Sequence, residues 1–474
     1  MKRRILWLPL LLAAILASCT PRERTLVLLS TNDMHARIQR FPQLAAAVGA
    51  CRDTAQCVVL VDAGDRWTGN AYVDMAPTPG MPVIALMNAL GYDVATLGNH
   101  EFDRGQAHLG RMIDSMDFEV VCANVVSDTC TFRQLPPCTV LERGGIRIGF
   151  VGVVTNYEGP GHPAGNASCF EGLEFPDPQQ MAAQYGAGLR GKVDVLVLVS
   201  HMGDDRDAEY LATGTPYDVV IGGHTHEVRD TVVGGVLLTQ TGKNLTNVGV
   251  TTVRLKGRKV VGREFRIVPL NGYDPDPEYA ERVARYYADP ALNRPVGEFV
   301  SAANAWGVAN WMADAVADEA DAEIGIYHVG GVRLDSIPAG GVGTARIFDL
   351  EPFGTQIARI GMTPAQLRRL IVTKYNDTEN RKESHRVDLV ATTPYEIITD
   401  RRDSALDVRF PRLAEGRRYR VAMSDYVYRN YKGLEGTDGR ITDQKVADVL
   451  LEELADDSPV VPDNRPRQRV VRLR

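Results

Sequence analysis

The chain has 474 residues, of which 24% are charged and 44% hydrophobic, a composition typical of a folded globular protein rather than a disordered one. This length exceeds what one hydrophobic core usually supports, so we expect two domains. The formal net charge of −7 argues against nucleic acid as a partner, and it requires that any anionic substrate be attracted by a local group of cations.

The first residues have the pattern of an export signal. Three basic residues, 2–4, precede an apolar run, 5–17, that is too short to span a bilayer and contains a proline. The run ends in Leu16-Ala17-Ser18-Cys19, which resembles a bacterial lipobox, so we expect cleavage after residue 18 and a lipid on Cys19. The alternative is an ordinary signal peptide followed by a coincidental cysteine.

Cleavage at this point would anchor the mature chain to a membrane through Cys19. Removal of residues 1–18, which hold three basic residues and no acidic residue, would lower the net charge from −7 to −10. Thr20 follows the cysteine and is not an acidic retention signal of the kind known in some bacteria. We therefore expect a lipid-anchored protein of the bacterial cell envelope, on the periplasmic or outer face of the outer membrane.

Six further cysteines lie in the first half of the chain. An even number in an exported protein favours disulfides, although six cysteines allow fifteen pairings and spacing alone does not choose among them. None forms a CxxC pair, so we interpret them as structural staples rather than zinc ligands or a redox centre. They are Cys51, Cys57, Cys122, Cys130, Cys138 and Cys169.

Residues 26–269 predict an α/β domain. Short runs rich in Val, Ile and Leu alternate with glycine-containing loops and helix-like segments, as expected of strands buried on both faces. Segments 248–255 and 259–269 alternate in polarity and predict a closing hairpin. The expected buried strands are 26–30, 58–61, 94–96, 120–123, 146–154, 193–200, 219–221 and 236–240.

The pattern changes at residue 271. Asn271-Gly272 and two Asp-Pro pairs interrupt the chain, and residues 278–288 then read as a charged helix, so we expect a linker over 271–299. A second α/β domain, 300–474, opens with a predicted helix over 310–320 and an apolar run over 323–327. Residues 374–388 predict an exposed loop. The expected division is therefore 1–18, 19–270, 271–299 and 300–474.

Polar clusters follow five of the expected strands of the first domain. Loops at the carboxyl ends of parallel strands are where α/β proteins collect their ligands. Each cluster alone is weak evidence, because a lone Asp-x-His or Gly-Asp is usually a turn or a surface pair. Together they offer carboxylate, imidazole and amide groups that would enclose two divalent cations. The clusters are Asn32-Asp33-Met34-His35, Asp62-Ala63-Gly64-Asp65, Gly98-Asn99-His100-Glu101-Phe102-Asp103, Ser200-His201 and Gly222-Gly223-His224-Thr225-His226.

In this order the clusters resemble the signature of calcineurin-like metallophosphoesterases. The presence of a second domain narrows the resemblance to the secreted 5′-nucleotidase family, over nearly the whole mature chain, more strongly in 25–270 than beyond 300. The resemblance implies a four-layer α/β/β/α sandwich followed by a smaller α/β domain that binds substrate.

The resemblance also implies the ligands of two metal ions. Asp65 would bridge them, because it belongs to both sets. His226 stands where some family members have glutamine, which could change the preferred metal. Asp62, three positions before Asp65, is expected to be structural. The first set is Asp33, His35, Asp65 and His226, and the second is Asp65, Asn99, His201 and His224.

His100 is the expected acid or transition-state stabiliser. It adjoins the candidate ligand Asn99, and Asp103 lies three positions further on, where its carboxylate could accept a hydrogen bond from the ring and fix its tautomer. The alternative is that His100 only packs within the loop.

In the second domain the resemblance is looser. Gly330-Gly331-Val332-Arg333 is similar to the family's glycine-rich turn, so Arg333 would grip phosphate, although His328 replaces the usual leading asparagine. Phe353 and Tyr426 resemble the two aromatic residues that stack on the base, with core packing as the alternative. Thr355 replaces an expected asparagine, and Asn430-Tyr431-Lys432-Gly433 stands where the family has a loop of two glycines and an aspartate.

We expect a phosphomonoesterase that uses two divalent metal ions, Mn, Zn, Mg or Ca, to hydrolyse nucleoside 5′-phosphates outside the cytoplasm. The expected partners are a nucleotide substrate and, through Cys19, a membrane. The metal centre would equally serve a nucleoside diphosphate-sugar hydrolase or a 2′,3′-cyclic-nucleotide phosphodiesterase. A nucleotide-binding lipoprotein without activity is the alternative from another class.

Overall fold

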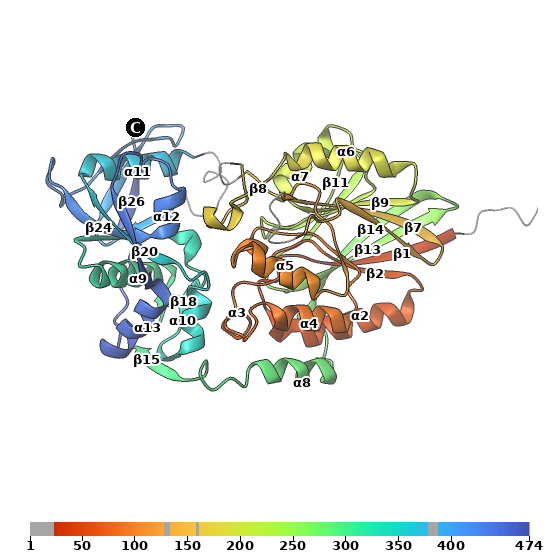
Figure 1. Ribbon diagram of the computed structural model, residues 1–474, viewed down its shortest axis with the longest axis horizontal. Coiled ribbons are helices and arrows are strands. Elements are labelled where there is room, and N and C mark those ends of the chain that lie inside the picture. Colours follow the sequence, from red (N-terminus) through yellow and green to blue (C-terminus); the bar gives the residue numbers. More distant parts are fainter. Residues whose placement is uncertain (1–22, 128–132, 158–160, 378–386, 474) are drawn as a thin grey trace, which may run out of the picture.

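The computed structural model describes residues 23–127, 133–157, 161–377 and 387–473, which form two lobes (Figure 1). The expected signal peptide 1–18, Cys19, Cys130 and residues 378–386 of the expected exposed loop lie outside them. Within the described ranges, no helix is both long enough and apolar enough to cross a membrane.

The N-terminal domain is built on two six-stranded sheets that pack face to face (Figure 1). The first sheet has the order β14-β13-β1-β2-β3-β4, with strands β1 Glu23–Thr31, β2 Val58–Asp62, β3 Val94–Ala95, β4 Glu119–Val120, β13 Asn247–Lys256 and β14 Lys259–Pro269. The second has the order β11-β12-β10-β9-β7-β6, with β6 Cys138–Arg143, β7 Ile146–Val154, β9 Val195–His201, β10 Val219–Ile221, β11 Val228–Val233 and β12 Val236–Thr241. A small pair, β5 Val126–Ser127 and β8 Leu173–Glu174, lies apart.

The central strands of each sheet are parallel. β1, β2, β3 and β4 pair in parallel in the first sheet, and β7, β9, β10 and β12 do so in the second. The carboxyl ends of these strands therefore meet at one edge of the sandwich, where the loops that follow them can converge.

Strand residues alternate between an inner and an outer core. In β1, Leu26 and Leu28 pack between the two sheets, whereas Val27 and Leu29 face the helices. This alternation follows from the two-residue period of a strand, and because both faces are buried, both sets of residues are apolar.

Helices cover the outer face of each sheet. The first sheet packs against α2 Phe41–Thr54, α4 Met81–Leu90, α5 Gln106–Asp114 and α8 Pro277–Tyr286. The second packs against α6 Pro178–Arg190 and α7 Asp204–Ala212. The layers run α/β/β/α, which confirms the predicted sandwich. Shorter elements are η2 Ile38–Arg40, α3 Ala71–Asp74, η3 His100–Phe102, η4 Ala167–Phe170 and η5 Leu270–Gly272.

The segment expected to link the domains contacts both of them. Val283 of α8 belongs to the core beneath the first sheet. β15, Pro295–Phe299, instead pairs with β19, Gly340–Gly343, in the C-terminal domain. The chain therefore passes between the domains after α8, in 287–294.

The smaller C-terminal domain confirms the predicted α/β class. Its five-stranded sheet has the order β21-β17-β24-β20-β25, with β17 Ile324–His328, β20 Gln356–Met362, β21 Leu389–Ala391, β24 Tyr419–Ser424 and β25 Gly439–Lys445. One face packs on α9 Ala305–Glu319, α10 Thr344–Leu350 and α13 Val446–Asp456. The other packs on α11 Pro364–Asn376 and a three-stranded sheet of β22 Tyr395–Thr399, β23 Ala405–Arg409 and β26 Gln468–Arg472. Also present are β16 Ala303–Asn304, β18 Ser336–Ile337, η6 Val329–Gly331 and α12 Asp425–Asn430.

The cysteines differ from expectation. Five of the six, Cys51, Cys57, Cys122, Cys138 and Cys169, are free thiols, and Cys130 lies outside the described residues. The five are distributed over separate parts of the sandwich: Cys51 and Cys122 pack in the core beneath the first sheet, Cys57 between the sheets and Cys138 in the core beneath the second. The prediction of disulfide staples is wrong for these five residues.

Candidate active site

All seven candidate metal ligands lie at the carboxyl-end edge of the two sheets. Asp33 and His35 follow β1, Asp65 follows β2, and Asn99 follows β3 in the first sheet. From the second sheet come the remaining three, with His201 as the last residue of β9 and His224 and His226 after β10. The strands thus bring residues from 33 to 226 into one small volume.

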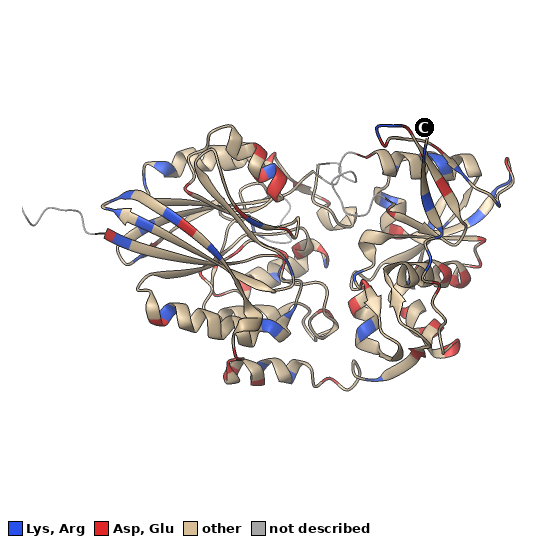
Figure 2. Cartoon of the chain, turned by 180° about the vertical axis from the view of Figure 1, so that it is seen from behind, with Lys and Arg blue, Asp and Glu red and all other residues tan. Residues whose placement is uncertain are grey.

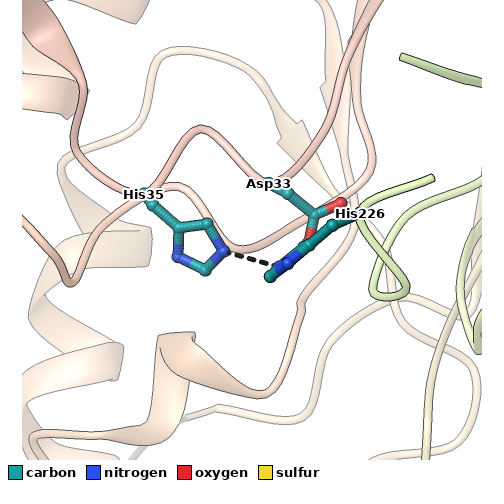
Figure 3. Close-up of side chains that lie close together, drawn as sticks. All are labelled: Asp33, His35 and His226. Carbon is teal, nitrogen blue, oxygen red and sulfur yellow. Dashed lines mark hydrogen bonds and ion pairs between the residues drawn. The ribbon is translucent and has the colours of Figure 1, made fainter. Parts of the chain in front are cut away.

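The first candidate metal site consists of Asp33, His35 and His226 (Figure 3). Nε2 of His226 lies 3.6 Å from Oδ1 of Asp33 and 3.0 Å from Nε2 of His35. Two imidazole nitrogens at this separation cannot both carry protons, but both can direct lone pairs at one cation.

The second candidate metal site consists of Asp65, His201 and His224. Nε2 of His201 lies 3.2 Å from Oδ2 of Asp65 and 3.9 Å from Oδ1 of Asp33. Oδ1 of Asn99 lies 3.1 Å from Nδ1 of His224, which brings the fourth predicted ligand into the same group. Asp65 also forms a third, overlapping group with His35 and His100, so its carboxylate faces both sites.

Five of the seven candidate ligands have left-handed backbone conformations. The φ angles are 48° for Asp33, 44° for His35, 55° for Asp65, 84° for His224 and 62° for His226. Each such residue other than glycine costs about 1–3 kcal/mol, and strain of this kind concentrates at functional sites. The surrounding fold therefore holds these side chains in place against their local preference.

The donor set fits a pair of divalent cations. His201 is fully buried, and its Nδ1 donates to the carbonyl oxygen of Ala63 at 2.6 Å, which leaves Nε2 facing the site. Among the described residues, that nitrogen has no hydrogen-bond partner of acceptable geometry. A buried ring nitrogen, two buried carboxylates and further imidazoles suit zinc, manganese or a similar ion.

The electrostatics of the site agree with this. Burial holds the pKa of His35 well below its ordinary value, and the positive charges of Arg333 and His226 lower it further. His35 is therefore neutral, as a metal ligand must be. Burial lowers the pKa of His201, but Asp65 and Asp33 outweigh it and raise that pKa to about 10. His201 thus balances the buried carboxylates with a proton, which metal binding would release.

Glu101 positions Asp65 and was not predicted as a site residue. The side chain is fully buried, and Oε2 accepts from the backbone N–H groups of Asp65 at 2.9 Å and Gly98 at 2.6 Å. Oε1 accepts from the N–H group of Arg66 at 2.8 Å. One carboxylate thereby ties the loop after β2 to the loop after β3. Its position directly after Asn99-His100 gave no signal of this role, because backbone N–H partners have no residue signature.

Two glycines allow these loops to approach so closely. Gly64 has φ of 95°, and a Cβ added there would lie 2.5 Å from the backbone nitrogen of Gly98. A Cβ on Gly98 would lie 2.2 Å from Oδ1 of Asp65. A larger residue at either position would therefore displace the candidate bridging carboxylate.

Asp62 has a structural environment. Its Oδ1 accepts from Arg66 Nη1 at 3.1 Å and from the backbone N–H of Gly64 at 3.1 Å, while Oδ2 accepts from Thr31 at 2.8 Å. These bonds use both carboxylate oxygens at the base of the loop, which agrees with a supporting role.

His100 and Asp103 form a hydrogen-bonded pair. Nδ1 of His100 donates to Oδ2 of Asp103 at 2.8 Å, and its backbone N–H donates to Oδ1 of Asp65 at 2.9 Å. Burial lowers the pKa of His100, but the carboxylates of Asp103 and Asp65 outweigh this effect and raise it. The pair is held by η3, and Nε2 is left for a substrate.

The C-terminal domain places Arg333 and Phe353 beside this pair. The ring of Phe353 stacks on His100 with centroids 5.7 Å apart and an angle of 19°. The guanidinium of Arg333 lies 5.6 Å from the centre of the Phe353 ring, and its charge lowers the pKa values of His35 and His226. Two residues from the second domain thus face the candidate metal sites.

Tyr426 belongs to a separate aromatic group within the C-terminal domain. Its ring stacks on His328 at 4.7 Å and 20°, and Tyr431 packs edge-on against it at 6.0 Å. His328 is buried beneath the glycine turn, where a Cβ on Gly331 would lie 2.5 Å from its ring. His328 therefore supports Tyr426, and Lys432 is exposed to solvent.

The two domains meet close to the site. The backbone N–H of Ala71 donates to Asp349 at 2.7 Å, and Tyr72 OH donates to Oδ1 of Asn293 at 2.5 Å. Ala71, Leu292 and Ala345 form a small apolar cluster there. These contacts hold the C-terminal domain in the arrangement that brings Phe353 onto His100.

Two families match the chain, one for each domain. Calcineurin-like phosphoesterase matches residues 26–228, and the 5′-nucleotidase C-terminal domain matches residues 295–437. The first range contains all seven candidate ligands with His100 and Asp103. The second contains Arg333, Phe353 and Tyr426.

Individual proteins are similar over one or both domains. An endonuclease, YhcR, of Bacillus subtilis is 24% identical over 408 residues, which cover 74% of this chain and 33% of that protein. The 5′-nucleotidase of Vibrio cholerae is 28% identical over 231 residues, 43% of this chain and 40% of that protein. The chain thus spans well under two thirds of the length of these relatives.

A solved structure shares the whole fold. The 5′-nucleotidase precursor from Thermus thermophilus superposes with a TM-score of 0.80 at 20% identity, covering 94% of this chain and 99% of that one. The order of the two domains, the matched families and this superposition agree. The chain therefore combines a calcineurin-like phosphoesterase domain with a 5′-nucleotidase C-terminal domain, and it shares the fold of this 5′-nucleotidase.

Proposed function

We propose that this chain is a metal-dependent phosphomonoesterase that hydrolyses nucleoside 5′-phosphates to nucleoside and phosphate outside the cytoplasm. The observation that carries the proposal is the position of Asp65, whose carboxylate belongs to both the Asp65–His201–His224 group and the His35–Asp65–His100 group. A carboxylate in this position would join two cations beside the His100–Asp103 pair.

Two divalent cations in such a site would draw charge from the phosphate oxygens and acidify a water for attack on phosphorus. Most of the side chains that would hold them stand at strained backbone positions, which the surrounding fold must impose. Asp33, His35, Asp65 and His226 would hold one ion. Asp65, Asn99, His201 and His224 would hold the other.

His100 would act on the substrate directly. Nδ1 keeps its proton in the hydrogen bond to Asp103, so Nε2 has a proton to donate to a phosphate oxygen or to the leaving 5′-oxygen only when the ring is an imidazolium. The raised pKa keeps His100 protonated over more of the neutral range than an ordinary histidine. An imidazolium here would also neutralise charge that develops in the transition state.

The C-terminal domain would recognise the remainder of the nucleotide. Arg333 would bind phosphate through its guanidinium fork, and two contacts support this role: Phe353 stacks on His100, and Arg333 lies beside the Phe353 ring. Phe353 and Tyr426 would stack on the base. Stacking contributes about 1–3 kcal/mol per base and accepts any base, so we expect broad base tolerance.

We also propose that the chain is anchored to the outer membrane by a lipid on Cys19. The basic residues 2–4, the apolar run 5–17 and the Leu-Ala-Ser-Cys sequence that ends it support this proposal.

The test is phosphate release from a substrate panel after chelation and after addition of Mn²⁺, Zn²⁺, Mg²⁺ or Ca²⁺. The panel contains adenosine and uridine 5′-monophosphates, a nucleoside diphosphate-sugar, a 2′,3′-cyclic nucleotide and p-nitrophenyl phosphate. We expect the monophosphates to have the highest kcat/KM. A higher value for the diphosphate-sugar or cyclic nucleotide would replace the proposed substrate, and binding without release would leave a nucleotide-binding lipoprotein.

A further inference from the structure

The edge of the sandwich opposite the candidate site carries a distinct surface. The parallel strands of both sheets begin there, and β1 begins at Glu23 beside Lys256, its partner on β13. Nη2 of Arg24 donates to the carbonyl oxygen of Gly257 at 2.6 Å, and its Nη1 contacts Gly145 in the turn before β7. We call this surface the amino-end face and define it by residues 23–24, 93, 142–147, 190–194, 218 and 256–259.

The amino-end face is basic on a chain of negative net charge. Figure 2 shows Lys and Arg gathered at the end of the catalytic domain where β1 begins, and the C-terminal domain lies at the other end. The face holds eight cations against five carboxylates. The cations are Arg24, Arg143, Arg147, Arg190, Lys192, Lys256, Arg258 and Lys259, and the carboxylates are Glu23, Asp93, Glu142, Asp194 and Asp218.

Each of the three aspartates of this face already forms an ion pair with an arginine. Asp93 pairs with Arg143 at 2.8 Å, Asp194 with Arg258 at 2.6 Å, and Asp218 with Arg190 at 2.6 Å. Four further cations, Arg147, Lys192, Lys256 and Lys259, are exposed and have no ion pair among the described residues. They leave the face with unneutralised positive charge.

The face also has a hollow in which an anionic group could be held. Its volume is about 500 Å³, and its charged lining is Arg190, Asp194, Asp218, Lys256, Arg258 and Lys259. The hollow is remote from the candidate metals, because the nine residues of β1 separate its two ends by about 30 Å. It therefore belongs to a different surface from the active site.

The position of Cys19 places this face near any membrane to which the cysteine is attached. Only three residues, 20–22, separate Cys19 from Glu23, so the start of β1 can be no more than about 14 Å, four residue steps, from the lipidated residue. That distance is comparable to the Debye length of about 8–10 Å in physiological salt, so charges on the face would feel an anionic bilayer.

We propose that the amino-end face docks on the anionic headgroups of a phospholipid membrane, with Lys256, Lys259, Lys192 and Arg147 as its main contacts. This inference goes beyond the proposed activity. It depends on the proposed lipid anchor in one respect, because the anchor would determine which membrane the face meets. Docking would direct the carboxyl-end edge, with the active site, away from the bilayer and toward soluble substrate. The hollow beside Arg190 and Arg258 would receive a headgroup phosphate.

The test uses a chain of residues 20–474, which lacks the cysteine but retains every residue of the hydrophobic cores, the first of which is Leu26. Its flotation with vesicles of equal parts phosphatidylglycerol and phosphatidylcholine is compared with flotation on phosphatidylcholine alone. We expect binding to the anionic vesicles only, and loss of that binding at high salt. Because acylation is impossible in this chain, failure of the lipid anchor cannot affect the result.

Two quadruple variants then localise the binding. The first variant removes four cations of the face through Arg147→Gln, Lys192→Gln, Lys256→Gln and Lys259→Gln. Each cation near an anionic surface strengthens binding about fivefold, so we expect this variant to bind the anionic vesicles at least tenfold more weakly. The second variant is the control and makes the same charge change at exposed positions of the C-terminal domain, through Arg401→Gln, Arg402→Gln, Arg412→Gln and Arg418→Gln. It should leave binding to the vesicles unchanged. Both variants should retain the wild-type circular dichroism and melting temperature.

Three results would overturn the proposal. One is equal flotation of the chain with neutral and anionic vesicles, and another is an equal loss of binding in both variants. The third is binding of duplex DNA as tight as that of the vesicles, which would indicate a general polyanion site rather than a membrane contact.

Discussion

Replacement of Glu101 by glutamine tests how the candidate bridging carboxylate is held. The glutamate accepts three backbone N–H groups in a fully buried position, from Asp65, Gly98 and Arg66. An amide can keep two of these bonds at its oxygen, but its NH₂ group then faces the N–H of Arg66. A buried donor left without an acceptor costs about 1–3 kcal/mol, and the two remaining bonds lose the strength that the charge gave them.

We therefore expect Glu101→Gln to lower the free energy of unfolding of the catalytic domain by about 3 kcal/mol. In a domain of this size, each kcal/mol moves the melting temperature by about 2–4 °C, so the shift is about 6–12 °C. Displacement of Asp65 should also lower kcat by about 10–100-fold, because small misplacements of reacting groups are costly.

The assay is differential scanning calorimetry with metal analysis and phosphate release on the same samples. Glu142→Gln is the matched control, because Glu142 is exposed on β6 and its loss makes the same charge change. If Glu101→Gln melts at the wild-type temperature and turns over normally, the carboxylate does not position Asp65 and the reasoning fails.

Three further predictions concern catalysis, anchoring and specificity. His100→Asn should lower kcat by about 10²–10⁴-fold with the metal content unchanged, and Asp103→Asn should lower it less; loss of an ion from the first variant in elemental analysis would make His100 a ligand instead. Cys19→Ser should prevent incorporation of labelled fatty acid into the chain, and labelling equal to that of the wild type would refute a lipid on this residue. Phe353→Ala combined with Tyr426→Ala should weaken turnover of adenosine and uridine monophosphates and spare p-nitrophenyl phosphate, so equal losses on all three would exclude base stacking.

The grouping of the candidate ligands at one edge could be predicted from the sequence because each of them closely follows an apolar run. Asp33 comes two residues after β1, Asp65 three residues after β2, and His201 ends β9. Parallel strands bring such positions to one edge whatever the details of packing. His100 and Asp103 were predictable for a similar reason, since their spacing within one short loop already allows the ring to reach the carboxylate.

Glu101 could not be predicted because its role depends on backbone N–H groups, which carry no residue signature. Its partners, Gly98, Asp65 and Arg66, come from two loops whose separation is set by tertiary packing. The extent of the expected strand 120–123 was likewise set by tertiary contacts that the sequence does not reveal. Only Glu119–Val120 pairs in the sheet, because Cys122 and Ala123 donate instead to Pro136 and Gly152.

The two edge strands of the second sheet were also missed. β6 is only partly buried along its length and β11 is almost wholly exposed, so neither has the apolar run that marked the central strands. The contact of Phe353 with His100 also could not be predicted from the sequence, because it depends on how the two domains meet at Ala71 and Asp349.

Metal stoichiometry in Asp65→Asn, measured with turnover, tests the dinuclear centre most directly. An amide cannot neutralise two cations as a bridging carboxylate does, whereas the other candidate ligands remain in place. We expect two divalent ions in the wild-type chain after reconstitution, fewer ions in the variant, and loss of adenosine monophosphate hydrolysis by the variant. Two ions retained in Asp65→Asn with near-normal turnover, or full wild-type activity after complete chelation, would contradict this expectation.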